Sequence, residues 1–477
     1  MLDRTLLRKQ RHGPSETTNR RSASLTIDTS RRCSRPGSRP YLPRYLTSLG
    51  LACGAVVAAT SARAQYVPGY FPIGVPGYDQ ELGVTVVSRL RPLYAERGVR
   101  IGDLIVRADL DQSLGYDSNV LGRSGGRGSP VVVTSPRASF NSDWGRDAFG
   151  ASFSLSNRAY PATPSQNSTD WTAALGGGYT IGRHNLTLSY AHLQLHESPT
   201  SIGAPPTTTP VSFSVDDFRI SYKFDLGRLE ITPNAEALLW RYGNATIDGI
   251  PTSEAFRDVD QVRGGAGFRY SLAGRTALLF TMQAIRSDFV NNVVGTPSQS
   301  STSILAMGGI DYQYDGVWRY QALVGVEARY FNSDRFKNRV APIARAAVIW
   351  TPTGLTTVTA TVLRTIEDPV EIGTSGFTYT TGALRVDHEY LRNVLLNART
   401  GIERITYLQN GGAQTGVFAG AGVTWLLNRH LRLSAQYTYT TESNLGGQSA
   451  GEVQSSSAFF TPGSSQNVFL LTMHVGL

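Results

Sequence analysis

The stretch Trp318–Tyr330 places apolar and polar side chains on opposite faces of an extended strand. A β-strand turns successive side chains to opposite sides, so residues two apart share a face. One face carries Trp318, Tyr320, Ala322, Val324, Val326, Ala328 and Tyr330, and the other carries Arg319, Gln321, Gly325, Glu327 and Arg329. At roughly 3.3 Å per residue, a strand of this length tilted by about 40° crosses the hydrocarbon layer of a membrane. Its terminal aromatic residues occupy the positions of the interfacial girdles of membrane barrels.

The same alternation recurs along most of the chain, for example over residues 217–226, 417–425 and 431–440. Between Tyr190 and Leu193 the apolar positions change phase, which predicts a β-bulge. The alternating segments from residue 105 to 477 number about 18, within a range of 16 to 18. An open sheet edge in hydrocarbon leaves unpaired N–H and C=O groups, so such a sheet has to close. We therefore predict an all-β fold, a transmembrane antiparallel up-and-down β-barrel.

Short turns join the predicted strands in pairs, and most contain glycine, which supplies the positive φ of tight hairpins. They are Gly145-Arg146, Gly182-Arg183, Gly227-Arg228, Gly274-Arg275, Asp315-Gly316 and Thr353-Gly354. Their spacing of roughly 40 residues also fits a β-propeller, but propeller blades use four shorter strands per repeat. An even strand count predicts short turns in the periplasm and longer loops outside the cell. The last strand alternates up to Leu477, as a signal for the barrel assembly machinery does.

The first 64 residues have the features of a leader. Twelve of the 45 Lys and Arg and three of the 36 Asp and Glu lie there, so the net charge of +9 belongs to this part and the remainder is neutral. An Arg-rich stretch, an apolar run from Leu46 to Thr60 and Ala62-Arg63-Ala64 follow the order of a secretory signal peptide. We predict cleavage after Ala64. Both cysteines, Cys33 and Cys53, lie in the leader, and the neutral remainder predicts no nucleic-acid partner.

Residues 65–104 are rich in proline and glycine, with Val67-Pro68-Gly69-Tyr70 repeated as Val75-Pro76-Gly77-Tyr78. Such a density of turn-forming residues opposes a regular element. We predict an extended periplasmic segment. The alternatives are a docking segment for a periplasmic partner and an inward-folded piece that narrows a lumen.

A barrel of 16 to 18 strands leaves an aqueous channel. The side chains predicted to line it are Asp217, Arg219, Lys223, Asp225, Glu230, Glu236, Arg319, Glu327, Arg329, Arg399, Glu403 and Arg432. Their mixed signs argue against a strong ion filter, which needs a ring of one sign. Pairing across neighbouring strands to stiffen the wall is the alternative role. The long loops 199–210 and 444–466 either cap the pore, fold into it or cover the outer surface.

No motif predicts an enzyme, a cofactor or a metal site. His192 and His196 have the four-residue spacing of a zinc pair on a helix, but on a strand these side chains lie about 13 Å apart. The glycines at 264–267 lack the lysine of a phosphate-binding loop and fall within a predicted strand.

The region from Arg89 to Val120 resembles the start of the barrel in the putative β-barrel porin 2 family of outer-membrane proteins. In that family an R-x-R-P and a G-x-R-x-G segment lead into a first strand that ends in tyrosine, an acidic residue and asparagine. The matching residues are Arg89, Arg91, Pro92, Gly98, Arg100, Gly102, Tyr116, Asp117 and Asn119. Asp103 departs from the apolar or aromatic residue usual after the last glycine. The resemblance implies an outer-membrane barrel, with relatives linked to exopolysaccharide export and no catalytic residues.

We expect an outer-membrane pore that passes polar solute or polysaccharide, with a slight preference for polysaccharide export. General diffusion of small solutes is an alternative, and a structural or adhesive barrel with a plugged lumen is an alternative of another class. The partners expected are outer-membrane lipid, the barrel assembly machinery and a periplasmic polysaccharide-export component.

Overall fold

The computed structural model describes residues 70–72, 74–78, 85–89, 91–123, 125–204, 207–247, 249–272, 275–314, 316–369, 372, 374–408, 412–445 and 463–477. The predicted leader, its cleavage point after Ala64 and most of the loop 444–466 lie outside these residues. No helix in the described part of the chain is long and apolar enough to span a membrane.

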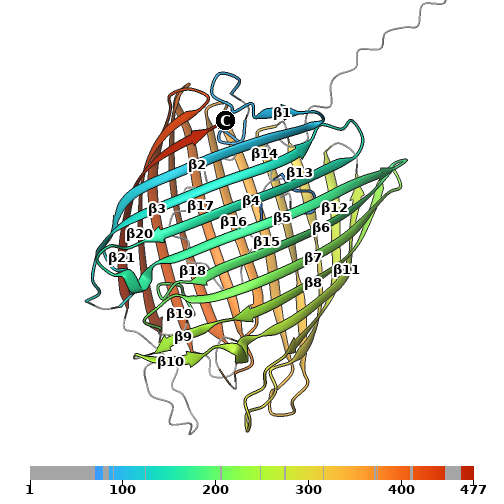
Figure 1. Ribbon diagram of the computed structural model, residues 1–477. Helices are drawn as coiled ribbons and strands as arrows, with labels where there is room; N and C mark the ends of the chain where they lie inside the picture. Colours follow the sequence, from blue (N-terminus) through green and yellow to red (C-terminus); the bar gives the residue numbers. More distant parts are fainter. Residues whose placement is uncertain are drawn as a thin grey trace, which may run out of the picture. The chain divides into compact units, whose positions relative to one another are not determined.

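Eighteen long antiparallel strands form a closed barrel, as predicted (Figure 1). They are β2 (Leu104–Asp117), β3 (Ser129–Ser142), β4 (Ala148–Ala159), β5 (Ser168–Ile181), β6 (His184–Glu197), β7 (Val211–Asp225), β8 (Leu229–Tyr242), β11 (Val259–Ser271), β12 (Thr276–Phe289), β13 (Ser301–Tyr314), β14 (Trp318–Phe331), β15 (Arg339–Thr353), β16 (Thr356–Glu367), β17 (Phe377–Leu391), β18 (Val394–Tyr407), β19 (Ala413–Leu426), β20 (Leu431–Leu445) and β21 (Ser464–Gly476). Each strand pairs with its sequence neighbour, and β2 pairs with β21 to close the ring.

Three smaller strands accompany the barrel. β1 (Val99–Ile101) pairs with the start of β2, while β9 (Asn244–Ile247) and β10 (Ile250–Ser253) form a hairpin in the loop between β8 and β11. We call the barrel end where β2 begins and β21 finishes the near end, at the top of Figure 1, and the opposite end the far end. Short turns lie at the near end and longer loops at the far end.

The two faces of β14 show why the sheet closes as it does. Val324 and Val326 on the outer face are 68% and 52% exposed, whereas Glu327 and Arg329 on the inner face are 3% and 4% exposed. Large apolar side chains on an outer face this exposed match the solvent of a lipid bilayer rather than water. Trp318 and Trp350 stack at 5.2 Å near one end of this face, where an interfacial girdle is expected.

The near-end turns have the predicted positive φ at three described glycines, but Gly145 and Gly354 do not adopt it, so the prediction is wrong for those two turns. Gly182, Gly227 and Gly316 have φ values of +63°, +89° and +70°, which side chains with a Cβ rarely adopt. Gly274 and Asp315 lie outside the described residues.

The predicted bulge in β6 is wrong. Its register with β5 and β7 is continuous, so the chain does not change phase. Leu193 and Leu195 instead face inward, 0% and 1% exposed, because an apolar cluster lines the far half of this wall. Alternation therefore persists while the chemistry of the inner face changes from polar to apolar.

The described parts of residues 65–104 are not an extended spacer, so that prediction is wrong for them. Val75 and Val86 are buried against the inner face of the barrel, at 1% and 4% exposure. This corresponds to the alternative in which the segment folds inward. We call its described residues from Tyr70 to Arg97 the N-terminal strap.

Candidate functional site: the barrel interior

The first anchor of the strap is an aromatic pair on β7. Phe71 and Tyr78 stack at 4.7 Å between ring centroids, and the Arg219 guanidinium lies 4.4 and 4.5 Å from their centroids. The Tyr78 hydroxyl donates a hydrogen bond to the Asp217 carbonyl oxygen at 3.2 Å. A cation held over aromatic faces away from water contributes about 1–2 kcal/mol. Arg219, predicted to line the lumen, thus binds the strap through these two aromatic rings.

Glycines on the wall make room for this contact. A Cβ on Gly176 of β5 would lie 2.2 Å from the Pro76 carbonyl oxygen, and one on Gly150 of β4 would lie 2.8 Å from the Gly74 carbonyl oxygen. Both distances are shorter than atoms tolerate, so the strap backbone rests directly on the wall at two glycines. The position of the strap therefore depends on residues of the barrel strands as well as on residues of the strap.

The second anchor lies on β16 and β17. The Val86 amide donates to the Thr357 hydroxyl at 2.9 Å, and Arg89 and Arg91 both donate to the Glu389 carboxylate. Arg91 is 8% exposed and also donates to the Val86 carbonyl oxygen at 2.7 Å. The strap thus contacts one wall at β4 to β7 and another at β16 and β17.

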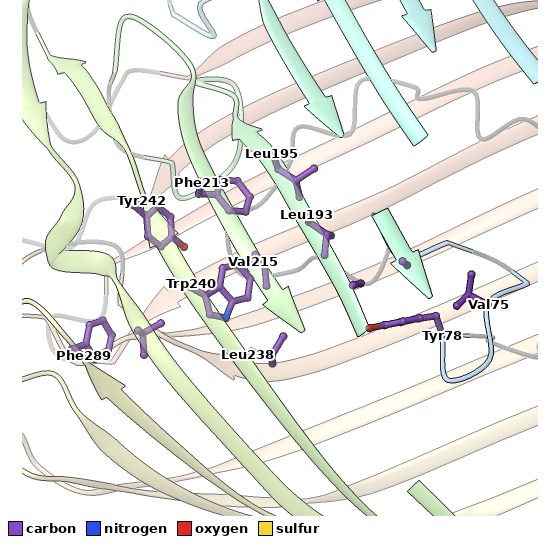
Figure 2. Packing of buried hydrophobic residues seen from close by; sticks show 13 residues of the cluster. Val75, Tyr78, Leu193, Leu195, Phe213, Val215, Leu238, Trp240, Tyr242 and Phe289 are labelled. Atoms are coloured by element: carbon purple, nitrogen blue, oxygen red, sulfur yellow. The ribbon is translucent and has the colours of Figure 1, made fainter. Parts of the chain in front are cut away.

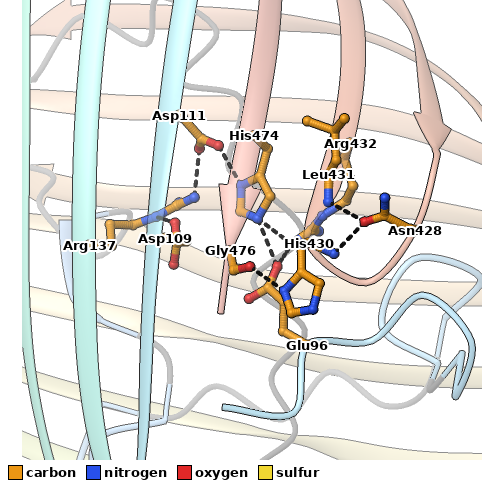
Figure 3. A network of polar contacts seen from close by, with 10 residues as sticks. All are labelled: Glu96, Asp109, Asp111, Arg137, Asn428, His430, Leu431, Arg432, His474 and Gly476. Atoms are coloured by element: carbon orange, nitrogen blue, oxygen red, sulfur yellow. Dashed lines mark hydrogen bonds and ion pairs between the residues drawn. The ribbon is translucent and has the colours of Figure 1, made fainter. Parts of the chain in front are cut away.

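An ionic network forms the third anchor, at the near end (Figure 3). Glu96 of the strap accepts from Arg432 of β20 and lies 2.7 Å from His474 Nε2 of β21. His474 Nδ1 lies 2.5 Å from Asp111, which Arg137 also contacts at 2.6 Å. Burial raises the pKa of Glu96, but the bond to His474 and the charge of Arg432 outweigh it, so the pKa lies below its ordinary value.

This network is balanced without a metal ion. Asp109, Asp111 and His474 bring ligand atoms within 4.8 Å of one another, a spacing that suits a metal. The Arg137 guanidinium, however, bonds both carboxylates, at 2.7 and 2.6 Å. An arginine in the place of the cation satisfies these oxygens, so the cluster acts as a structural tie between β2, β3 and β21.

The loop between β6 and β7 crosses toward the opposite wall. Ile202 packs with Phe377, Tyr379 and Ile405 of β17 and β18, and the Gly203 amide donates to Gln414 of β19 at 2.9 Å. The described residues of this loop around Ile202 fold inward over the far half of the barrel, one of the three alternatives left open by the sequence.

An apolar cluster covers the far half of the inner wall from β5 to β12 (Figure 2). Phe213 stacks with Trp240 and Tyr242 at 6.1 and 5.6 Å. Val75 and Tyr78 of the strap belong to the same cluster, which continues the first anchor toward the far end.

Buried ion pairs border this cluster. Arg329 of β14 bonds Asp368, just after β16, at 2.8 Å and approaches Glu327 at 3.4 Å. Arg257 bonds Glu197 at 2.9 Å with both side chains at most 5% exposed. Charges this deeply buried are stable only when paired, so these bonds fix the far-end loops against the wall.

The structure places the charged residues predicted to line the lumen on the inner face, mostly in pairs. Arg219 contacts Asp217 and Glu236 at 2.7 and 2.9 Å, and Lys223 approaches Glu230 at 3.5 Å. Further partners are Arg183 for Asp225, Asp311 for Arg319, Asp368 for Arg329, Thr438 for Arg399, Tyr379 for Glu403 and Glu96 for Arg432. Pairing across neighbouring strands, the alternative role, describes the contacts of Arg219, Lys223, Arg319 and Glu403, whereas Arg329, Arg399 and Arg432 contact residues beyond the neighbouring strand.

The residues that match the family's motif, from Arg89 to Asn119, stabilise the strap and the pairing of β2 with β21. Asp117 at the end of β2 accepts two bonds from Gln466 of β21, at 2.9 and 3.0 Å, and Asn119 donates to the Ser465 carbonyl oxygen. Tyr116 faces outward at 52% exposure. The near-end members form turns and ties: Gly98 and Gly102 have positive φ, Arg100 pairs with Asp143, and Arg89, Arg91 and Pro92 lie in the strap.

A family profile described as Putative beta-barrel porin 2 matches residues 91–456, which is most of the barrel. The chain belongs to this family. A comparison with curated proteins gave no match.

Several solved structures resemble this porin 2 family barrel at low sequence identity. The FrpB iron transporter of Neisseria meningitidis is 10% identical with a TM-score of 0.42, covering 78% of this chain and 81% of its own. OccK2 (OpdF) of Pseudomonas aeruginosa is 10% identical with a TM-score of 0.43, covering 79% and 98%. The copper transporter OprC is 10% identical with a TM-score of 0.44, covering 80% and 81%.

Sequence reasoning missed the strap anchors of this porin 2 family chain. His474 of β21 is the register partner of Asp111 in β2, so a search for charges at matching inner-face positions of the first and last strands could have paired these two. No such register places Glu96, which precedes β2 in the chain. No sequence signal joins Phe71 and Tyr78 to Arg219, because 141 residues separate Tyr78 from that arginine's position in the chain and only the closed barrel brings them together.

Proposed function

We propose that this chain is a pore of the outer membrane for polar solutes. The observation that carries the proposal is the inner face, where charges of both signs extend from Lys223 and Glu230 near one end to Glu327 and Arg329 near the other. An apolar outer face and a charged inner face are the arrangement of a water-filled barrel in lipid.

The strap limits what can pass. Its anchors on β7 and on β17 hold chain against two parts of the wall, so we expect a conducting path narrower than a bare 18-strand barrel. Small polar solutes fit this restriction. Export of a surface polysaccharide, the narrower function expected from the family, requires the strap to leave the lumen.

Planar bilayer recordings of the refolded protein test the pore. We expect single channels whose conductance rises when residues 65–97 are deleted. Heat-modifiable migration on a gel is the control that both forms are folded barrels. A folded barrel that stays silent with and without the strap would contradict the proposal.

Swelling of liposomes separates the two cargoes. Uptake of small neutral sugars by the intact protein supports general diffusion. Passage of a long polysaccharide only through the strap-deleted form supports export, with the strap as the element that must move. A polysaccharide that passes neither form removes export from consideration.

A structural or adhesive barrel is the second candidate, of a different class. The inward contacts of Ile202 with β17 and β18 favour it, because chain packed across the lumen obstructs the passage of solutes. A structural or adhesive barrel does not require an open channel. Loss of surface attachment on trimming residues 446–462, with permeability unchanged, would support this function.

The proposal includes outer-membrane lipid and the barrel assembly machinery as partners, and no enzymatic activity. A periplasmic polysaccharide-export component is a partner only under the export function. Co-purification from cross-linked membranes tests that component, and its absence there would speak for diffusion alone.

A further inference from the structure

Two arginines oppose each other directly on the inner wall. Arg385 of β17 and Arg399 of β18 are cross-strand partners in the antiparallel register. Their strand neighbours Leu384 and Ile402 are 42% and 52% exposed on the outer face, so the arginines face the interior. Like charges at directly opposite positions repel each other and destabilise the pair of strands.

The described carboxylates do not balance both arginines. Asp387 accepts both of its bonds from Arg385, from Nε at 2.8 Å and from Nη2 at 2.9 Å. Among the described residues, Arg399 has no carboxylate within ion-pair distance. Its Nη2 donates to the Thr438 hydroxyl at 3.2 Å, and its Nε is buried without a hydrogen-bond partner. A buried guanidinium donor without an acceptor is costly to leave unfilled.

A glycine on the next strand leaves space for the Arg399 guanidinium. Gly420 of β19 is the register partner of Arg399, and a Cβ there would lie 3.3 Å from Nε and 3.4 Å from the Thr438 oxygen. Because glycine leaves this space free, the guanidinium extends over β19 toward β20. The position is therefore shaped so that Arg399 reaches a neutral hydroxyl, with one donor left over.

We propose that Arg385, Arg399 and Thr438 form an anion-binding position on the inner wall. It takes a carboxylate or phosphate group of a solute, because the Arg399 guanidinium keeps a buried donor without a partner beside the charge of Arg385, and the planar donor set of arginine suits these oxygens. The position rests on the proposed pore and gives its solutes a class, namely polar molecules that carry an acidic group.

Calorimetric titration of the refolded protein in detergent tests this position without requiring conduction. The probes are galacturonate, inorganic phosphate and, as the uncharged match, galactose. We expect the wild type to bind one or both anions and not galactose. Arg399→Gln should weaken anion binding by about tenfold or more, the effect of losing a charged hydrogen bond. Binding of galacturonate alone identifies a carboxylate site, and binding of phosphate alone a phosphate site.

Arg404→Gln is the matched control, since Arg404 lies on the same strand but is exposed on the outer face. It should leave the affinity unchanged. Equal weakening by both variants, or no anion binding to folded wild type, overturns the position even where bilayers show conductance. Silent bilayers with intact anion binding contradict the pore alone.

Discussion

Arg91 of the strap donates a hydrogen bond to Glu389 of β17 at 2.7 Å, although 298 residues separate them in the chain. Both side chains are at most 9% exposed, so each charge has lost its hydration and is stabilised by the other charge instead. The bond ties a segment before the barrel to a strand near its end. Breaking this bond should therefore loosen the strap at its second anchor.

Glu389→Gln should loosen the strap. The change leaves the buried Arg91 beside a neutral amide, which weakens a charged hydrogen bond by about 2 kcal/mol. We expect higher channel conductance and faster trypsin cleavage after Arg89. Asp143→Asn is the control, because its pair with Arg100 is largely exposed and contributes little. Equal cleavage in both variants would show that Glu389 does not hold the strap.

Gly176→Ala should displace the first anchor without altering the outer face. The new Cβ would lie 2.2 Å from the Pro76 carbonyl oxygen, so the strap backbone has to shift. We expect conductance to rise and cleavage of the strap to accelerate, with barrel stability lowered by about 1–3 kcal/mol at most.

Gly178→Ala is the matched control on the same strand and face. A Cβ there meets its closest neighbours at 3.8 Å, an ordinary contact. A Gly176→Ala channel indistinguishable from Gly178→Ala would place the strap away from β5.

The third anchor should weaken in acid. Because the folded pKa of Glu96 lies below its ordinary value of 4.5, its contribution is complete above that pH and is lost as the pH falls through the lower folded pKa. The charged groups near Glu96 are Arg432, His474, Arg107 and Arg137. We expect trypsin-independent proteolysis of the strap, for example by pepsin, to rise below pH 4.5.

Glu96→Gln should remove that rise, since the amide does not titrate. The variant should show the same strap exposure at neutral pH as the wild type shows in acid. A wild-type acid profile retained in Glu96→Gln would assign the effect to other carboxylates.

The barrel was predictable because a strand in lipid has to sort its side chains strictly by face. Val324 and Glu327 obey this rule in sequence and in structure. The rule failed at Leu193, where apolar side chains on the inner face were read as a change of phase. The outer face is constrained by lipid where a strand crosses the bilayer, whereas the inner face contacts whatever folds into the lumen. At the far end of β6 the outer face carries His192 and His196, each paired with an aspartate.

The inward position of the strap and its contacts could not be predicted from the sequence for the same reason. Val75-Pro76-Gly77-Tyr78 has the composition of a spacer, and its place depends on Gly176 and Arg219, which reach it only after closure. Arg399 was predicted to face the lumen, but its direct opposition to Arg385 depends on the register of two strands. Periodicity gives the face of a residue and leaves its cross-strand partner open.

Val324→Arg tests the lipid-facing reading of the barrel. Val324 lies in the middle of β14 and is 68% exposed on the outer face. An arginine near the bilayer midplane costs about 2–4 kcal/mol, so the variant should unfold at lower denaturant concentration in lipid vesicles. Gln321→Arg places the same side chain on the inner face of the same strand and should cost much less. Equal losses of unfolding free energy in the two variants would mean that both faces of β14 meet the same solvent, which a barrel in lipid does not allow.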